Sequence, residues 1–409
     1  MSLQIGYAQS VITPSLERPV YLAGFGRNRR AVSVHDELFA RVLALVSGDE
    51  CVVVAALDLV GLGRRYCGKI GERVGVKTLI ACTHTHHGPD TIGLWGPDET
   101  TSGVDTVYPE RHGIFDMTCL EEAVVATILE ALRDLQVARL RSTSTVVAGI
   151  ARNARDEEIL DQELTCLQFC RPDSDRPLVT WLTYPCHPEV LWDENPHISS
   201  DYIGPLRDCV EQATGAPCLA TVGALGGMMT PNMPGHTFAD ADAMGTTLGR
   251  AALSALAGIE PIPAERLQFA GREFAIPLTN PIFRVAAQLG VIDNVADEAG
   301  EVITEANLIR LGAEPGVWLA TAPGELLPKL GLTAKDEMRR AGAATAAVIG
   351  LVNDELGYIL PEEQFIFPDN PFEPRDHYEE TMSVGSEAGP RFMAALRSLF
   401  LIEYGDISE

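Results

Sequence analysis

The hydrophobic pattern of the chain is a series of apolar runs of strand length, separated by segments with helical spacing. Near-continuous apolar runs lie at 42–46, 51–59, 77–82, 178–184, 219–222, 315–325 and 344–352. Runs of this kind are typical of strands that are covered on both faces of a sheet. Further strands are predicted at 139–151, 162–170 and 266–277.

Apolar residues at helical spacing predict helices between these strands. They are expected at 121–135, after residue 202 through Ala213, at 240–256, at 326–338 and at 391–401. Thr118 and Glu121 fit a capping box for the first helix, and the segment 199–202 would cap the second. Strands that alternate with helices predict an α/β fold.

Potential metal ligands and catalytic side chains are most concentrated in the segment Thr-His-Thr-His-His-Gly-Pro at 83–89. It lies directly after the apolar run 77–82. Side chains alternate in an extended segment, so His84 and His86 are expected on one side and His87 on the other. Two imidazoles on one side can serve one metal, or one metal and a substrate. The alternative is that one or more of these histidines only completes a buried hydrogen bond.

Three more candidate ligands stand at or just after the ends of apolar runs, namely His187, Glu325 and Tyr358. The ends of strands in an α/β fold can meet at one edge of a sheet, where active sites lie. Two imidazoles, a carboxylate and an oxygen donor suit a catalytic zinc. Alternatively, Glu325 interacts with a helix dipole and Tyr358 is a packing residue.

Polar segments supply the candidate pocket walls. The Gly/Pro-punctuated segment 90–112, which contains Trp95, is predicted to wall a pocket, and the acid-rich stretch 293–305 is predicted to be irregular. Arg152 and Arg155 close a predicted strand, where they are either surface residues or can orient a substrate carbonyl or phosphate.

Charge and cysteine content limit the partners and the compartment. The chain has 31 Lys and Arg against 57 Asp and Glu, and the net charge of −26 argues against nucleic acid and anionic membranes as partners.

Nine cysteines without a CxxC pair suit reduced thiols. The first residues lack the pattern of a signal peptide, and no run of eighteen apolar residues occurs. A cytoplasmic protein without a transmembrane segment is expected.

In their order along the chain, five motifs resemble the catalytic domain of the neutral, non-lysosomal ceramidase family, zinc amidases that cleave the fatty acyl amide of ceramide. The motifs are Thr83–Pro89, His187-Pro188 with 199–201, Pro323-Gly324-Glu325, Asn353-Asp354 with Tyr358, and Tyr378-Glu379. The resemblance spans nearly the whole chain. It implies a single large domain, 1–409, with mixed β-sheets flanked by helices and the active site at strand ends, and without the C-terminal β-sandwich domain of the family.

The resemblance also implies roles for individual residues. One zinc per chain would be held by His84, His187, Glu325 and Tyr358. His86 would be catalytic, with Tyr378 or Arg155 stabilising the oxyanion. Thr230 stands where the family has serine. The family's Asn-Arg pair corresponds here to the segment 152–155, which contains two arginines, and Arg155 is favoured as the one that orients the substrate.

The function that this predicts is zinc-dependent hydrolysis of an amide bond by a metal-bound water. The substrate implied by the resemblance is an N-acylated sphingoid base, a lipid. One alternative is a zinc hydrolase of a smaller soluble amide or ester, and another is a metal-stabilised binding protein without turnover. All three take a small-molecule partner.

Overall fold

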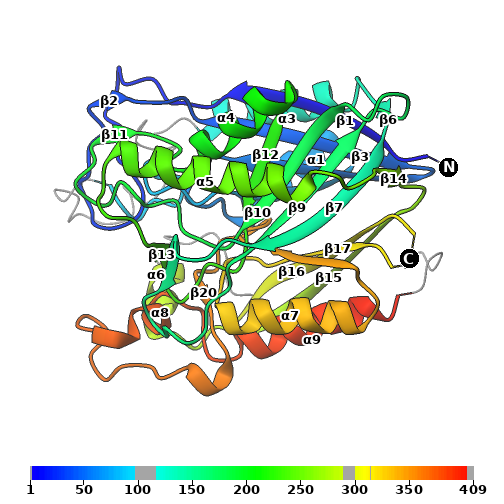
Figure 1. Cartoon of the computed structure of the whole chain (residues 1–409). Coiled ribbons are helices and arrows are strands. Elements are labelled where there is room, and N and C mark those ends of the chain that lie inside the picture. Colours follow the sequence, from blue (N-terminus) through cyan, green and yellow to red (C-terminus); the bar gives the residue numbers. More distant parts are fainter. Residues whose placement is uncertain (1, 97–116, 289–299, 314, 403–409) are drawn as a thin grey trace.

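Three sheets of four or five strands form the frame of the molecule, and helices cover their outer faces (Figure 1). The structure is a computed structural model that describes residues 2–96, 117–288, 300–313 and 315–402. The start of β1 (Gln4–Val11) and the end of α9 (Ala388–Phe400) lie toward the right of the view in Figure 1, away from α6 (Pro281–Gln288) and α8 (Tyr378–Thr381).

The first sheet has the strand order β5-β4-β3-β1-β6. Its strands are β1 (Gln4–Val11), β3 (Phe39–Ser47), β4 (Glu50–Leu57), β5 (Lys77–Cys82) and β6 (Gln136–Val137). Strands β4 and β5 are parallel and are joined through helix α1 (Arg64–Val74), while the other pairs are antiparallel. Helix α3 (Met117–Ala131) packs on β1 and β3.

The second sheet has the order β12-β10-β9-β7-β14. Its strands are β7 (Arg139–Val146), β9 (Glu163–Cys170), β10 (Pro177–Tyr184), β12 (Cys218–Val222) and β14 (Ile262–Pro263). The parallel pair β10 and β12 is connected through helix α4 (Ile203–Thr214). Helix α5 (Phe238–Leu256) packs on α4 and lies over β7 and β9.

The third sheet has the order β15-β16-β17-β19. Its strands are β15 (Leu267–Pro277), β16 (Glu301–Leu311), β17 (Val317–Thr321) and β19 (Thr345–Ile349). Here β17 and β19 are the parallel pair, joined through helix α7 (Pro328–Arg340). Helix α9 (Ala388–Phe400) covers β15 and β16, and α6 (Pro281–Gln288) follows β15.

Short elements complete the fold near the ends of these sheets. Three two-stranded pairs are β2 (Ser33–Val34) with β11 (His197–Ile198), β8 (Ala151–Asn153) with β13 (Met229–Pro231), and β18 (Glu325–Leu326) with β20 (Tyr358–Ile359). Helix α8 (Tyr378–Thr381) lies in the same region, together with the 3₁₀ turns Glu362–Gln364 and Arg375–His377.

One buried cluster joins the three sheets. Leu45 of the first sheet, Trp181 of the second and Leu319 of the third belong to the same apolar core, and each is at most 1 % exposed. The strand ends are also tied together, because Gly350 N donates to Val222 O and Cys82 N to Leu351 O. Parallel pairs of all three sheets therefore end in one region of the molecule.

The mixed α/β fold with helix-flanked sheets is confirmed, and the strands differ from the prediction mainly at their ends. The segment 139–151 contains two elements, β7 and β8, and 315–325 is interrupted between β17 and β18. Residues 301–305, predicted to be irregular, belong to β16, whereas 293–299 lie outside the described residues.

Two predicted helix caps are wrong. Thr118 lies inside α3, which already includes Met117. Helix α4 has Tyr202 as its N-cap without a side-chain capping bond. The polar groups before it bind elsewhere, since Ser200 Oγ donates to Asp36 and the Asp201 carboxylate accepts from the amides of Val190 and Leu191.

The described residues contain no helix long and apolar enough to cross a membrane.

A buried ion pair connects the first two sheets. Asp58 follows β4 and pairs with Arg207 of α4 through two contacts of 2.9 and 2.8 Å, with both side chains at most 2 % exposed. Asp58 also accepts from the backbone amide of Phe39 and from the Thr83 hydroxyl. Because Thr83 precedes His84, the pair fixes the backbone that carries the first histidine.

We expect Arg207→Met to lower the free energy of unfolding by about 3–5 kcal/mol, because it leaves a buried carboxylate without its charged partner. Urea denaturation at pH 7 measures this loss. The exposed ion pair of Arg340 with Asp336 supplies a matched control, and Arg340→Met should change stability by about 0.5 kcal/mol or less. Equal effects of the two substitutions would contradict the role of the buried pair.

Candidate active site

Three histidines from two sheets form a cluster at the strand ends. His84 follows β5, His86 lies two residues later, and His187 follows β10. One ring nitrogen from each lies within 4.8 Å of the others, and the ring centroids are 5.0 to 5.7 Å apart. His84 and His187 are buried, and His86 is nearly so.

Backbone carbonyls fix the rings of His84 and His187. His84 Nδ1 lies 2.6 Å from Val60 O, and His187 Nδ1 lies 2.9 Å from Met229 O. A carbonyl oxygen can only accept, so each Nδ1 carries a proton and the opposite nitrogen, Nε2, faces the cluster. Histidines that bind metals are usually held in this way.

Glu325 completes a set of converging donor atoms. Its Oε2 lies 3.0 Å from His187 Nε2 and 3.6 Å from His84 Nε2. Two ligands bound about 2.0–2.1 Å from a tetrahedral zinc are about 3.3 Å apart. The three atoms thus have the spacing and the N and O donor types that fit a zinc ion.

Tyr358 stands beside Glu325 because of strand register. In the parallel pair β18 and β20, Glu325 is opposite Tyr358. Burial alone would raise the pKa of Glu325, but His84 and hydrogen bonds from His187 and Tyr358 lower it. A side chain at Gly226 would place its Cβ 2.4 Å from Glu325 O, so glycine permits the backbone contact that supports this segment.

The two histidines after His84 point in different directions. His86 joins the cluster, whereas His87 Nε2 lies 2.9 Å from Trp192 O and its Nδ1 lies 3.6 Å from Asp201. The expected division of sides is therefore present. However, the segment is not extended, because His84 has a φ of 66°.

The ring of His86 is enclosed on several sides. Phe25 contacts it edge-on at 4.9 Å, and a Cβ at Gly24, whose φ is 73°, would lie 2.4 Å from its Cγ. Arg29 donates to the carbonyl oxygen of His86 at 3.0 Å. The conformation of this histidine is thus set by a loop more than 55 positions earlier in the sequence.

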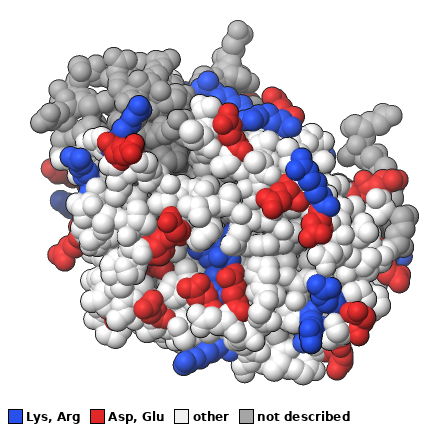
Figure 2. Space-filling model, turned by 90° about the horizontal axis from the view of Figure 1, so that it is seen from above, with Lys and Arg blue, Asp and Glu red and all other residues white. Residues whose placement is uncertain are grey.

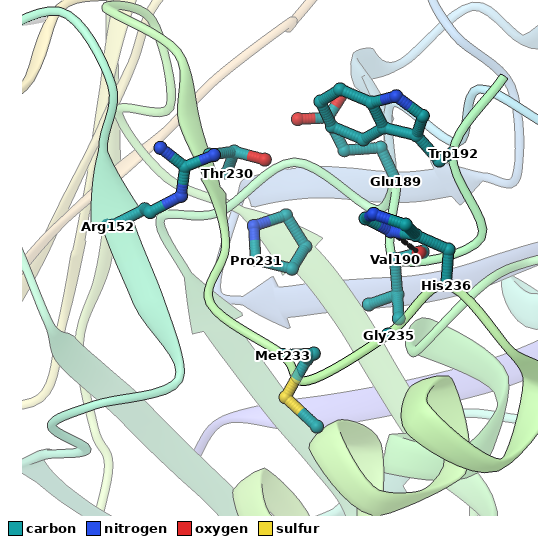
Figure 3. Close-up of a pocket in the computed structure, with 9 residues that line it drawn as sticks. All are labelled: Arg152, Glu189, Val190, Trp192, Thr230, Pro231, Met233, Gly235 and His236. Atoms are coloured by element: carbon teal, nitrogen blue, oxygen red, sulfur yellow. Dashed lines mark hydrogen bonds between the residues drawn. The ribbon is translucent and has the colours of Figure 1, made fainter.

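A pocket of about 90 Å³ adjoins the cluster (Figure 3). Its lining combines polar groups with apolar and aromatic walls, namely Arg152, Glu189, Val190, Trp192, Thr230, Pro231, Met233, Gly235 and His236. Arg152 and Thr230 are opposite each other in the β8–β13 pair, and the rings of Trp192 and His236 stack at 5.2 Å. Glu189 Oε2 lies 3.3 Å from His86 Nδ1, so the pocket reaches the histidine cluster.

The other predicted arginine is engaged elsewhere. Arg155 binds Glu379 and Glu380 through contacts of 2.8 Å, and it also donates to Gln364 O. These contacts fix helix α8, which begins with Tyr378. Tyr378 as a whole residue is 43 % exposed, yet partial burial and the nearby Glu325 carboxylate raise the pKa of its hydroxyl to about 12, so the hydroxyl keeps its proton at neutral pH.

The structure brings together His84, His86, His187, Glu325 and Tyr358, and places Thr230 and Arg152 at the adjoining pocket. Sequence reasoning missed Glu189, for which the only signal was its position two residues after His187. It placed Asp201 only in a helix cap and in a motif, whereas Asp201 and Arg29 hold the backbone around the site. Of the predicted pocket wall 90–112, residues 97–112 lie outside the described residues.

Comparison with known proteins supports the fold. No protein-family model and no curated protein matches the sequence. The structure of neutral ceramidase from Pseudomonas aeruginosa matches with a TM-score of 0.75 and 16 % identity, over 100 % of this chain and 76 % of that chain. A ceramidase structure complexed with C2 matches with a TM-score of 0.74 and 16 % identity, over 100 % and 77 % of the two chains. The chain therefore has the fold of these ceramidase structures.

The converging donor atoms predict that the purified protein binds about one zinc per chain. We expect His187→Ala and Glu325→Ala to lose most of this zinc, because each removes a donor atom of the central set. Inductively coupled plasma mass spectrometry measures the content. His197→Ala, which changes a histidine bound to Ser33 on β2, is the control and should keep its zinc. Full metal content in Glu325→Ala would exclude the proposed ligand.

Proposed function

We propose that this chain is a zinc-dependent hydrolase of amide bonds, of the ceramidase type. The observation that carries the proposal is the spacing of 3.0 and 3.6 Å between Glu325 Oε2 and the Nε2 atoms of His187 and His84. The ceramidase fold over the whole chain supports the same reaction class. We further propose that the domain spans residues 1–409.

In this proposal His84, His187 and Glu325 hold one zinc, and the Tyr358 hydroxyl is the fourth ligand. A zinc bound there would lower the pKa of a coordinated water to about 7 and polarise an amide carbonyl. The buried setting strengthens these electrostatic effects relative to water.

His86 and Tyr378 are proposed to act on the amide itself. As water adds to the carbonyl carbon, His86 Nε2 takes a proton from it, and the resulting N–H can then serve the oxyanion or the leaving nitrogen. Tyr378, which keeps its proton, donates to the oxygen that becomes negative. Breaking the carbon–nitrogen bond releases a carboxylic acid and an amine.

The two arginines are proposed to differ in their tasks. Arg152 and Thr230 line the pocket and are placed to orient the polar part of a substrate. Arg155, the residue favoured from the sequence, would act by holding the segment that carries Tyr378, since its guanidinium is engaged by Glu379 and Glu380.

An apolar cluster beside Tyr358 supports an acylated substrate. Leu327, Tyr358 and Leu360 form its buried part, and Met228, Phe365 and Met382 pack against them only partly buried. A fatty acyl group could contact these side chains, as in an N-acyl sphingoid base.

The small size of the pocket favours a second candidate, the hydrolysis of a shorter soluble amide. Its volume of about 90 Å³ suits a small polar group. Pockets for larger organic ligands are usually about 300–1,000 Å³. The two candidates share the same site and differ only in the substrate.

A nucleic-acid partner is not part of the proposal. On the face shown in Figure 2, basic side chains occur singly or beside acidic ones, without a continuous basic patch. The net charge of −26 opposes binding to a phosphate backbone. A cytoplasmic location remains our prediction.

We expect the zinc-loaded protein to release carboxylic acid from N-acyl amides and to lose this activity on chelation. A series from N-acetyl to N-dodecanoyl sphingosine, measured beside N-acetyl amino acids, tests the two candidate substrates. His86→Gln should keep its zinc and lose activity about 10²- to 10⁴-fold, because it removes the proton-transferring group. Release of acid from none of these amides would refute the proposed function.

The arginines provide a separate prediction. Arg152→Ala should lower kcat/KM about 10-fold or more, through loss of a charged hydrogen bond to the substrate, without lowering the melting temperature. Arg155→Ala should lower the stability by about 3 kcal/mol, because Glu379 and Glu380 lose their charged partner. Steady-state kinetics and thermal unfolding distinguish the two. The opposite pattern would assign the substrate contact to Arg155.

A further inference from the structure

A polar group lies beside Nδ1 of each histidine in the cluster, and the group beside His86 is different in kind. His84 and His187 contact backbone carbonyls. His86 Nδ1 instead lies 3.3 Å from a carboxylate oxygen, Oε2 of Glu189. Among the three rings, only that of His86 has an anionic group at this nitrogen.

The contact between Glu189 and His86 is deeply buried. The side chain of Glu189 is 1 % exposed and that of His86 is 11 % exposed. Within the described part of the chain, the two Glu189 oxygens and His86 Nδ1 are buried and have no hydrogen-bond partner of ordinary geometry, so their mutual contact of 3.3 Å is an ion-pair distance. A buried carboxylate is costly unless a donor satisfies it, and His86 Nδ1 is a donor nitrogen that the structure places beside this one.

The backbone around Glu189 is built together with the histidine site. Glu189 N donates to His187 O, and Trp192 N donates to Glu189 O, so Glu189 lies in a tight turn directly after His187. The Asp201 carboxylate holds the same turn through the amides of Val190 and Leu191. The turn aims the carboxylate toward the pocket that adjoins the cluster (Figure 3).

We propose that Glu189 is a positioning residue for His86. Its carboxylate accepts the Nδ1–H of His86 and so fixes both the tautomer and the ring orientation, with Gly24 and Phe25 enclosing the ring. Nε2 is then left with a lone pair that can take the proton of the attacking water. This inference rests on the proposed function insofar as His86 acts on a substrate.

The arrangement is comparable with other catalytic imidazoles that a carboxylate orients. When such a carboxylate is replaced, the ring takes the wrong tautomer or orientation and turnover falls, although the substrate still binds. Glu189 should therefore affect kcat much more than KM. At saturating zinc it should not change the metal content, because its side chain contacts His86, whereas only its backbone and its charge act on the proposed ligand His187.

The first test compares Glu189→Ala, Glu189→Asp and Glu189→Gln with the wild type, with the amide that the wild type cleaves best as substrate. We expect the alanine variant to keep its zinc and its KM and to lose kcat about 10²-fold or more. Glu189→Asp, which keeps the carboxylate, should recover part of the loss. Glu194→Gln, which changes an exposed acid in the same loop, is the matched control and should be unchanged.

Two results would overturn the inference. Unchanged kcat in both the alanine and glutamine variants would show that the carboxylate does not position His86. Parallel loss of zinc and activity in folded protein would place Glu189 in the metal site instead.

A second measurement does not depend on turnover. Nitrogen-15 NMR of the zinc-loaded protein with labelled imidazoles, with the His86 signals assigned by comparison with His86→Gln, reports the protonated nitrogen. We expect Nδ1–H in the wild type and an altered state in Glu189→Ala. An identical spectrum would refute the inference. If the wild type cleaves no amide, the proposed function fails while this spectrum still decides the role of Glu189.

Discussion

The buried ion pair between Asp58 and Arg207 is the contact on which the placement of the histidines depends. It joins the end of β4 in the first sheet to α4, the helix that connects the parallel strands of the second sheet. Asp58 also binds Thr83, the residue before His84. A buried pair is favourable only when its geometry is good and its remaining oxygens are satisfied, and the two contacts and additional donors of Asp58 meet that condition. The ion pair between Asp58 and Arg207 thereby helps to set the position of His84 relative to His187.

The oxygen donors Glu325 and Tyr358 come from the short parallel pair β18 and β20, of which β18 follows β17 of the third sheet. Each large sheet has one parallel pair with a helical connection, and parallel strands direct their carboxyl ends to one edge. His84, His187 and Glu325 follow β5, β10 and β17, one from each sheet. Hydrogen bonds between Gly350 and Val222 and between Cys82 and Leu351 tie these ends together. No single segment contains the site, so its geometry depends on the packing of all three sheets.

Local pattern was sufficient to predict most strands and the mixed α/β class, since buried strands have long apolar runs. Reactive residue types at strand ends also made His84, His187, Glu325 and Tyr358 candidates, which the structure brings together, but the pattern alone left Glu325 and Tyr358 open and the resemblance was needed to favour them as ligands. The cap at Thr118 was wrong because α3 begins before it, and the side-chain cap expected from 199–202 was wrong because Ser200 bonds to Asp36, a partner 164 positions away. Glu189 was missed for a similar reason. Its meaning comes from its contact with His86, about 100 positions earlier in the chain, and a lone acid has no periodicity to reveal it.

The charge balance of the cluster explains why a divalent cation suits it. Two carboxylates, Glu189 and Glu325, are buried beside three imidazoles. Burial lowers the pKa of His187, yet Glu189 and Glu325 together raise it to about 9, so the site attracts positive charge. A divalent ion offsets both carboxylates, whereas one proton on His187 offsets only one of them. The buried acids that orient the site therefore also create its negative potential. The same acids thus favour the binding of a metal ion and position the histidines.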